Sequence, residues 1–320
     1  MALRSRGPYP VLILQGEAGS AKSTATKTLK ALIDPTRPMV RALPRSERDL
    51  AIAADGCWVL AFDNLSGLPT WTSDALCRLS TGGGFATRAL YTDDEEHVFD
   101  LTRPVILNGL DAIATRQDLI TRGLIIRLEP IGEEERRDES EIWTEFEAAR
   151  PSLLGALLDA ASSALKREPS THLASKPRLA DFMTWVSAAE PALGWKPGTF
   201  VAAYEANAAF ALRMSLDGSA VAQAVIDLVR RPNAEGSWEG TPTALFKEIN
   251  YGKSPQDRAD KAWPKNPQVL SRKLTLLAAA LRAEGIDITD TTVGRDTAKQ
   301  RWVVIRDTSV IGDAGDGGNA

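Results

Sequence analysis

The chain of 320 residues is 43% hydrophobic and 25% charged, with a formal net charge of −4. These values are typical of a soluble globular protein, and no apolar run approaches the roughly 20 residues that a membrane span needs. The N-terminus lacks the apolar core of a secretory signal, so we expect a cytoplasmic protein without a membrane partner. Two cysteines, Cys57 and Cys77, without a Cys-x-x-Cys pair, exclude a disulfide framework and a zinc module.

The first predicted strand, at about residues 10–15, runs into a glycine-rich turn and then into a helix over about 22–33. Glycines let the backbone curl until its N–H groups point at phosphate oxygens. In such a loop Lys22 reaches the β- and γ-phosphates of ATP, and Ser23 binds Mg²⁺. The segment therefore predicts a nucleotide-binding loop made of Gly16, Glu17, Ala18, Gly19, Ser20, Ala21, Lys22, Ser23 and Thr24.

Ala21 occupies the position at which a glycine normally precedes the lysine. Its methyl group is tolerable if φ stays negative, so this departure weakens the prediction without excluding it. The alternative is an ordinary strand–turn–helix with a coincidental lysine. The order of strand, glycines, Lys-Ser and helix disfavours that alternative.

Residues 1–130 alternate short apolar runs with helical patterns, as an α/β fold with a parallel sheet does. Further strands are predicted at about 39–43, 57–63 and 103–108, and helices at about 46–54 and 70–80.

The strand at 57–63 ends in Asp63, and a carboxylate at the carboxyl end of a neighbouring parallel strand is suited to hold Mg²⁺ opposite the loop serine. The next residue is Asn64, where a second acid usually orients the attacking water. An amide cannot accept a proton, so either another acid serves, Asp74 or one of residues 93–96, or hydrolysis is slow.

The strand at 103–108 ends in Asn108, which is suited to a hydrogen bond with the γ-phosphate or the lytic water. Taken alone, it would be an ordinary turn asparagine. Arg122 precedes the last strand of this region and is our first candidate for an arginine that acts on the nucleotide of a neighbouring subunit, with Arg116 second. The alternative is surface arginines paired with local carboxylates.

Residues 82–99 predict an inserted hairpin, because alternating apolar residues flank an acidic turn. The chain carries, in order, the phosphate loop, the strand that ends in Asp63, the hairpin segment that contains ATR and LY, and the later sequences LNG and RG. Through these motifs, residues 8–130 resemble the superfamily 3 helicases. The resemblance is nearest to the poxvirus- and phage-type primase–helicase ATPases, which are AAA+ ATPases with a hairpin before the sensor-1 strand. The Ala-Lys-Ser ending of the loop is also similar to that of minichromosome maintenance helicases.

The resemblance implies a ring-shaped homo-oligomer, with a hexamer favoured, that binds ATP between subunits and grips DNA in a central channel. It assigns the nucleotide roles given above to Lys22, Ser23, Asp63, Asn108 and Arg122.

Two features depart from the family pattern. Asn64 replaces the family's acid, and the acidic hairpin tip at residues 93–96 would repel phosphates. Arg88 or His97 on the hairpin flanks is an alternative DNA contact.

Residues 131–216 are nearly all helical in pattern and predict a lid region that packs on the ATPase core. The charged run at 133–138 is typical of a solvated helix start. Residues 217–307 predict a winged-helix DNA-binding domain, with a long amphipathic helix at 266–284 and an alternating hairpin at 285–306. Residues 308–320 predict a disordered tail.

The segment from Lys247 to Arg306 carries twelve basic and seven acidic residues, a local reversal that contacts with DNA phosphates require. A helix in the major groove beside a basic wing is the usual docking. The alternative is a winged helix used for protein contact. The candidate DNA-binding residues are Arg272, Lys273, Arg295, Lys299 and Arg301.

The leading hypothesis is an ATP-dependent DNA motor, a helicase-type ATP hydrolase of phage or mobile-element replication. Because the chain starts only about ten residues before its first strand, we expect any primase to be absent or encoded separately. The alternatives are a nucleotide-gated DNA-binding regulator and a degenerate ATP-binding remnant. Asn64 and the acidic hairpin favour the regulator, and the other nucleotide-site motifs favour the motor.

Overall fold

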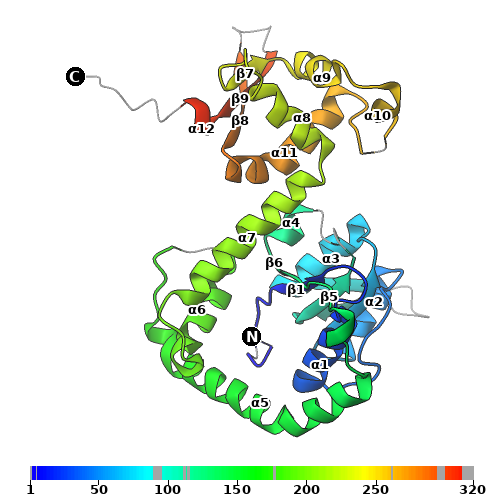
Figure 1. The fold of residues 1–320 in the computed structure, drawn as a ribbon, viewed down its shortest axis with the longest axis vertical. Coiled ribbons are helices and arrows are strands. Elements are labelled where there is room, and N and C mark those ends of the chain that lie inside the picture. Colours follow the sequence, from blue (N-terminus) through cyan, green and yellow to red (C-terminus); the bar gives the residue numbers. More distant parts are fainter. Residues whose placement is uncertain are drawn as a thin grey trace. The chain divides into compact units, whose positions relative to one another are not determined.

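The computed structural model describes residues 2–4, 6–88, 96–110, 113, 116–175, 178–260, 262–293 and 300–311, although the side chains of 85–88, 96–99, 291–293, 300 and 311 lie outside that description. The chain forms two compact units, Met1–Ala208 and Ala209–Ala320 (Figure 1). No helix in the described part of the chain has both the length and the apolar character that a bilayer span requires.

Unit 1 is an α/β core built on a four-stranded parallel sheet with the strand order β2-β5-β1-β6. The strands are β1 Val11–Gln15, β2 Leu60–Leu65, β5 Val105–Gly109 and β6 Gly123–Arg127. Every residue of β5 is buried, as expected for a parallel strand covered on both faces. This order places the carboxyl end of β5 between those of β1 and β2.

The strand predicted at residues 39–43 is reduced to one parallel bridge between Arg41 and Phe62. Pro38 and Pro44 flank this segment, and proline has no N–H to donate to a sheet. The segment therefore stays too short to form a regular fifth strand.

The helices of unit 1 include α1 Lys22–Ile33, α2 Glu47–Asp55, α3 Thr70–Thr81 and α4 Gln117–Ile120. Ala25, Leu29 and Ile33 follow one another at the four-residue spacing of a helix face. They pack on Leu14 and Ile106 of the sheet, so burial of this stripe fixes the start of α1 at the end of β1.

An antiparallel hairpin precedes β5, formed by β3 Gly84–Arg88 and β4 Glu96–Asp100, which confirms the predicted insertion. The later part of unit 1 is helical, as predicted: η1 Glu133–Glu135, α5 Glu139–Arg167, η2 Glu168–Ser170, α6 Ala180–Ala189, η3 Glu190–Leu193 and the first half of α7 Thr199–Asp217. The charged run at 133–138 forms a short 3-10 turn and an extended lead-in, and α5 begins only at Glu139.

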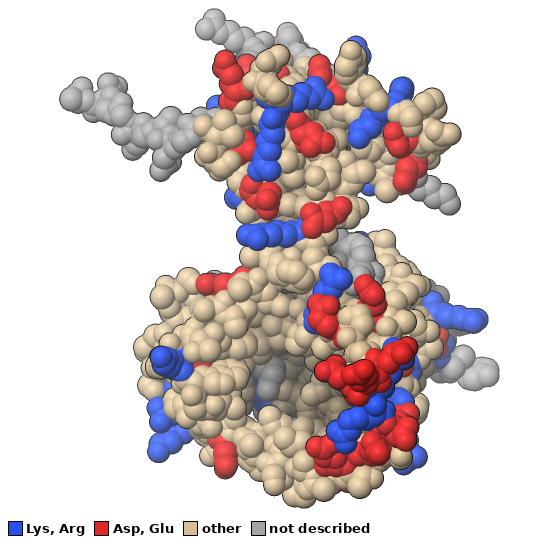
Figure 2. Space-filling view, viewed as in Figure 1, with Lys and Arg blue, Asp and Glu red and all other residues tan. Residues whose placement is uncertain are grey.

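Unit 2 contains an antiparallel sheet in the order β7-β9-β8, packed on helices. Its elements after α7 are α8 Ala220–Val229, β7 Ser237–Gly240, α9 Pro242–Asn250, α10 Pro255–Ala259, α11 Pro267–Ala283, β8 Ile286–Val293, β9 Gln300–Asp307 and α12 Thr308–Ile311. The predicted long helix and hairpin are confirmed as α11 and β8–β9. Figure 2 shows basic and acidic side chains interspersed on the face in view.

Candidate nucleotide-binding site

The loop between β1 and α1 places three residues at positive φ: Gly16 at 152°, Gly19 at 82° and Ala21 at 54°. Glycine adopts such angles without steric cost, whereas an alanine in the left-handed region costs roughly 1–2 kcal/mol. The condition under which an alanine is tolerable here, a negative φ, is therefore not met. Ala21 is the residue at which the loop turns into α1, and the left-handed conformation makes that turn.

The chain after β6 packs against this loop through the backbone. The N–H of Leu128 donates to the carbonyl of Gln15 at 2.7 Å, and that of Ile131 donates to Gly19 at 3.1 Å. A Cβ at Gly16 would lie 2.2 Å from the Leu128 carbonyl oxygen, so only glycine fits there. These contacts fix the shape of the loop from outside.

The same path brings Arg136 to the loop. A Cβ built at Gly19 would lie 3.6 Å from Nη2 of Arg136, although the two residues are far apart in sequence. Arg136 is exposed, and among the described residues it has no carboxylate partner, whereas its neighbour Arg137 pairs with Glu145 at 2.7 Å. Sequence reasoning assigned the charged run at 133–138 to solvent and missed this guanidinium.

Lys22 points into the loop that it follows. Its Nζ donates to the Glu17 carbonyl at 2.5 Å and to Oγ of Ser20 at 3.1 Å, and Ser20 Oγ itself donates to the same carbonyl at 2.9 Å. The ammonium group is thus held over the inner side of the loop, beside the N-terminus of α1. That end of a helix attracts anions, and a cation next to it strengthens the attraction for phosphate.

Ser23 and Asp63 meet across the sheet and helix layers. The Ser23 hydroxyl donates to Oδ1 of Asp63 at 2.8 Å, from the first turn of α1 to the carboxyl end of β2. A hydroxyl and a carboxylate at this spacing are oxygen ligands of the kind that Mg²⁺ takes in nucleotide sites. The pair therefore fits a metal ion bound between loop and strand.

Asn108, at 1% exposure, uses its amide inside the protein. Its Nδ2 donates to Oγ1 of Thr26 at 2.7 Å, and its Oδ1 accepts the N–H of Asn64 at 3.1 Å. Asn64 has a φ of 58°, and the pairing of β2 with β5 shifts register between Phe62 and Leu65. Such an irregularity re-aims side chains at the end of a strand, and Asn108 fixes it.

A cavity of about 500 Å³ brings most of the predicted nucleotide residues together. Asp63 is the only carboxylate among the described residues that line it. Gly16 and Glu17 shape the loop from outside the lining. The lining consists of Ala18, Gly19, Ser20, Ala21, Lys22, Ser23, Thr24, Asp63, Asn64, Asn108, Gly109 and Leu110.

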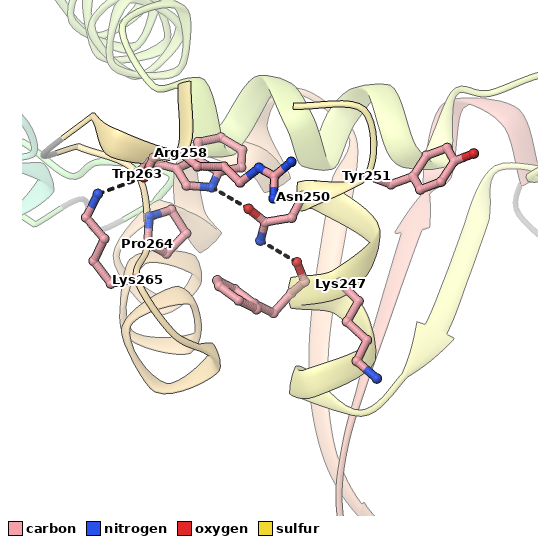
Figure 3. Close-up of a pocket in the computed structure, with 8 residues that line it drawn as sticks. Lys247, Asn250, Tyr251, Arg258, Trp263, Pro264 and Lys265 are labelled. Atoms are coloured by element: carbon pink, nitrogen blue, oxygen red, sulfur yellow. Dashed lines mark hydrogen bonds between the residues drawn. The ribbon is translucent and has the colours of Figure 1, made fainter. Parts of the chain in front are cut away.

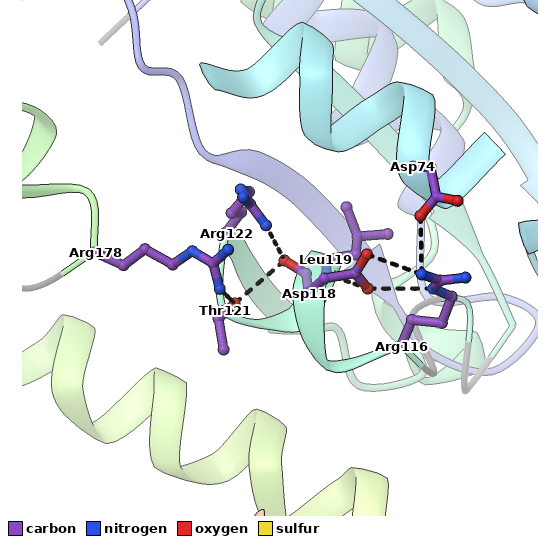
Figure 4. A network of polar contacts seen from close by, with 7 residues as sticks. All are labelled: Asp74, Arg116, Asp118, Leu119, Thr121, Arg122 and Arg178. Carbon is purple, nitrogen blue, oxygen red and sulfur yellow. Dashed lines mark hydrogen bonds and ion pairs between the residues drawn. The ribbon is translucent and has the colours of Figure 1, made fainter. Parts of the chain in front are cut away.

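Arg116 and Asp74 pair with each other instead of lining this cavity. The guanidinium donates to Asp74 at 2.8 Å and to Asp118 at 3.2 Å (Figure 4). The hydrogen bond that Arg116 donates to Asp118 raises the pKa of Arg116. Burial disfavours the Asp118 carboxylate, but the hydrogen bond and charge of Arg116 together with backbone hydrogen bonds outweigh burial, and the pKa of Asp118 is lowered. Asp74 is therefore committed to an ion pair and is not positioned as an alternative acid.

Arg122 also lies outside the lining of the cavity. Its Nη1 donates to the Asp118 carbonyl at 3.0 Å, and its buried Nε has no hydrogen-bond partner among the described residues. Arg178 lies beside it and donates to Oγ1 of Thr121 at 2.8 Å (Figure 4). Thr121, which itself donates to the Asp118 carbonyl, thus links the two guanidinium groups in one network away from the nucleotide cavity of their own chain.

The predicted DNA contacts are only partly within the described residues. Residues 93–95 lie outside them, as do the side chains of Arg88, Glu96 and His97. In unit 2 the exposed Arg272 and Arg301 line one depression of about 540 Å³, whereas Lys273 is half-buried on α11 and is not part of its lining. Arg301 is also paired with Asp290. The wing residues outside the described part are Arg295 and Lys299.

Two family models match the chain: residues 2–209 match the actinomycete integrative conjugative element replication protein, and residues 221–314 match the C-terminal domain of this RepA family. No curated protein matches it. Among solved structures it is similar to the A-form apo structure of the NrS-1 C-terminal region, at 11% identity and a TM-score of 0.39, over 93% of this chain and 66% of that one. That likeness is too weak to carry an argument. The first family match spans well over half of the sequence, so the chain belongs to the replication proteins of actinomycete integrative conjugative elements, and the predicted mobile-element replication context is confirmed.

Proposed function

We propose that the chain is an ATP hydrolase that acts on DNA during replication of its element, as a helicase-type motor of the AAA+ class. One observation carries the proposal: Lys22, Ser23 and Asp63 converge on one cavity, and the Ser23 hydroxyl lies 2.8 Å from the Asp63 carboxylate. The cavity lies at the carboxyl ends of the strands of a parallel sheet, where such folds bind ligands.

In this proposal each residue of the cavity has a defined task. The loop N–H groups and Lys22 bind the phosphates, and Ser23 with Asp63 would hold Mg²⁺. When bound, the metal ion neutralises charge on the transferring phosphoryl group. Asn108 acts on the reaction indirectly, because its amide holds the backbone at Asn64.

The cavity offers no second carboxylate among its described residues, and Asn64 can orient a water but cannot take its proton. We therefore expect slow turnover in an isolated chain. In a ring of subunits, a hexamer by the resemblance, Arg122 of one copy would reach the nucleotide of the next and neutralise transition-state charge.

The proposal divides the chain into an ATPase core at 1–130, a helical lid region at 131–216 and a winged-helix domain at 217–307. The order α9, α11 and the β8–β9 hairpin in unit 2 supports the winged helix. Arg272, Lys273 and Arg301, with Arg295 and Lys299 of the wing, are its proposed duplex contacts. A separately encoded primase remains a proposed partner.

The test is steady-state ATP hydrolysis with and without single-stranded and duplex DNA at low salt. We expect turnover that DNA stimulates, and no nucleotide binding in Lys22→Ala. An unchanged ATP affinity in that variant would overturn the assignment of the loop.

A second candidate function, a DNA-binding regulator gated by ATP, is favoured by the amide at Asn64. Tight ATP binding with negligible turnover, and DNA retention without unwinding, would support it. Asn64→Asp would then raise hydrolysis, provided that the amide alone limits the rate.

A further inference from the structure

A second groove in unit 2 lies between α9 and the segment that leads through α10 to α11. Its volume is about 430 Å³, within the range of roughly 300–1,000 Å³ typical of small-ligand sites. Figure 3 shows Trp263 and Lys265 on one side and Lys247 and Tyr251 on the other. The lining consists of Phe246, Lys247, Asn250, Tyr251, Arg258, Trp263, Pro264 and Lys265.

The lining combines cations with aromatic rings. Lys247, Arg258 and Lys265 are basic, and among the described residues of the lining no side chain is acidic. Tyr251 is 83% exposed at the end of α9, the highest exposure among the large hydrophobic residues described as exposed. A ring so exposed in a basic setting is not explained by packing.

Hydrogen bonds hold the walls of the groove in place. The Trp263 indole N–H donates to Oδ1 of Asn250 at 3.0 Å, and Asn250 Nδ2 donates to the Phe246 carbonyl at 2.6 Å. Arg258 donates twice to the Lys253 carbonyl, at 3.0 and 2.7 Å. The groove is therefore formed before any ligand enters, which lowers the entropic cost of binding.

Lys247 has no partner among the described residues, so its ammonium is available to a ligand. Lys265 is less available, because its Nζ donates to the carbonyls of Arg258 and Asp260, both at 2.8 Å. Lys253, beside the lining, lies with its Nζ 5.4 Å from the centroid of the Trp263 ring. The lining itself is thus cationic, and it favours a polyanion.

We propose that this groove binds single-stranded DNA, with a base stacked on Tyr251 and backbone phosphates at Lys247 and Arg258. Cationic grooves with exposed aromatic rings recognise single strands, because every base has a face that can stack. In a duplex the bases are paired and stacked inside, so the ring of Tyr251 would have no base face to cover. An acidic protein segment would match the charge but would leave the exposed ring unused.

The groove is separate from the depression that contains Arg272 and Arg301. The two share no lining residue, and they lie at opposite ends of α9, a helix of nine residues and thus about 13 Å long. The inference deepens the DNA-binding part of the proposed function: unit 2 would hold duplex at one end of α9 and a single strand at the other. It does not depend on ATP hydrolysis.

The test uses the full chain and a fluorescently labelled oligodeoxythymidylate, with binding followed by anisotropy at low salt. Tyr251→Ser should weaken binding by about 5- to 150-fold, the loss of one stacked base, whereas Tyr251→Phe should bind as the wild type does. Leu276→Ser is the matched control, because Leu276 is 62% exposed on α11 outside the groove. Lys247→Ala should reduce the slope of log affinity against log salt by about 0.7.

Equal affinity of wild type, Tyr251→Ser and Lys247→Ala for the oligonucleotide would overturn the proposal. An equal loss of duplex binding in these variants would also overturn it, because the groove would then not select single strands. ATP hydrolysis without DNA should be unchanged in both variants. Lys22→Ala should keep its oligonucleotide affinity, so failure of the nucleotide site and failure of the groove give different results.

Discussion

Asn108 joins the phosphate loop helix to the end of β2, and its removal tests how the site is held together. Asn108→Ala deletes two hydrogen bonds, to Thr26 and from the Asn64 N–H. The Thr26 hydroxyl has one proton, which it already donates to the Lys22 carbonyl at 2.9 Å. Thr26 therefore accepts from Asn108 and cannot donate to it.

The expected loss follows from these contacts. A typical hydrogen bond contributes about 1 kcal/mol net, and a buried donor left unpaired costs about 1–3 kcal/mol. For two bonds at a residue 1% exposed, we expect Asn108→Ala to lower the free energy of unfolding of unit 1 by about 2–4 kcal/mol. In a unit of this size that corresponds to a drop in Tm of about 4–16 °C.

Asn108→Asp is the sharper variant because it keeps the shape. Its carboxylate would place an oxygen against Oγ1 of Thr26, whose proton points elsewhere, and would bury a charge. At pH 7 we expect it to be at least as unstable as Asn108→Ala. The difference in free energy of unfolding between the wild type and Asn108→Asp should narrow as the pH falls, because a protonated acid can donate to Thr26.

Calorimetry of the full chain measures this effect, with the transition of unit 1 identified by its shift on addition of ATP and Mg²⁺. Thr26→Val, alone and combined with Asn108→Ala, gives the coupling energy of the pair. Asn108→Asp as stable as the wild type at pH 7 would refute the reasoning, since it would mean that the amide does not donate to Thr26.

Three further predictions concern the loop and its support. Ala21→Gly should raise the stability of unit 1 by up to about 1 kcal/mol. The substitution removes the strain of an alanine at a φ of 54°, and this gain exceeds the cost of the conformational entropy that glycine adds to the unfolded chain. A lower Tm in thermal unfolding would contradict the left-handed assignment. Arg136→Ala should weaken binding of a non-hydrolysable ATP analogue by up to about fivefold, the scale of an exposed charge pair. Arg137→Ala should leave that affinity unchanged in the same titration. Equal losses of affinity in both variants would contradict a specific contribution of Arg136 to nucleotide binding. Asp34→Asn should destabilise unit 1 by about 3 kcal/mol at pH 7, because it leaves the ammonium of Lys30, 2% exposed, without its carboxylate partner at 2.7 Å, and the hydrogen bond that remains, to Oγ1 of Thr36, supplies no negative charge. Burial disfavours the Asp34 carboxylate, but the hydrogen bond and charge of Lys30 together with backbone hydrogen bonds from Val59 and Trp58 outweigh burial and lower the pKa of Asp34. This stability is therefore present above about pH 4 and is lost as the pH falls through the folded pKa. Urea unfolding of wild type and Asp34→Asn at pH 7 and pH 3 checks this prediction. A difference in free energy of unfolding that is the same at both pH values would contradict it.

Local signals predicted the frame of the site. The helix expected over 22–33 is found at Lys22–Ile33, because an apolar stripe and a preceding glycine-rich turn are both visible in the sequence. The meeting of Ser23 with Asp63 follows from a topological rule, since carboxyl ends of parallel strands share one edge. Site residues whose positions follow from the strand topology could therefore be predicted from the sequence.

Contacts set by three-dimensional packing were not accessible. The left-handed turn at Ala21 is imposed by the path into α1, against the preference of the residue. Arg136 reaches the loop only because backbone bonds from Leu128 and Ile131 bring its segment there. The strand β7 was missed because it has four residues and acquires its pairing only from β9.

The two candidate arginines differ in what their displacement would cost. Arg116 holds two carboxylates, Asp74 and Asp118, and moving it toward a second chain would leave both unpaired. Among the described residues Arg122 makes one side-chain hydrogen bond, to the Asp118 carbonyl, and Arg178 belongs to the same network through Thr121. Moving Arg122 away would therefore break no ion pair among these residues and would separate two like charges. Among the described residues of unit 1, neither Arg122 nor Arg178 has a carboxylate partner. A triphosphate bound in a neighbouring subunit would offer an anion to both. The proposed dependence of turnover on assembly therefore rests more naturally on Arg122, with Arg116 as the anchor that keeps its segment in place.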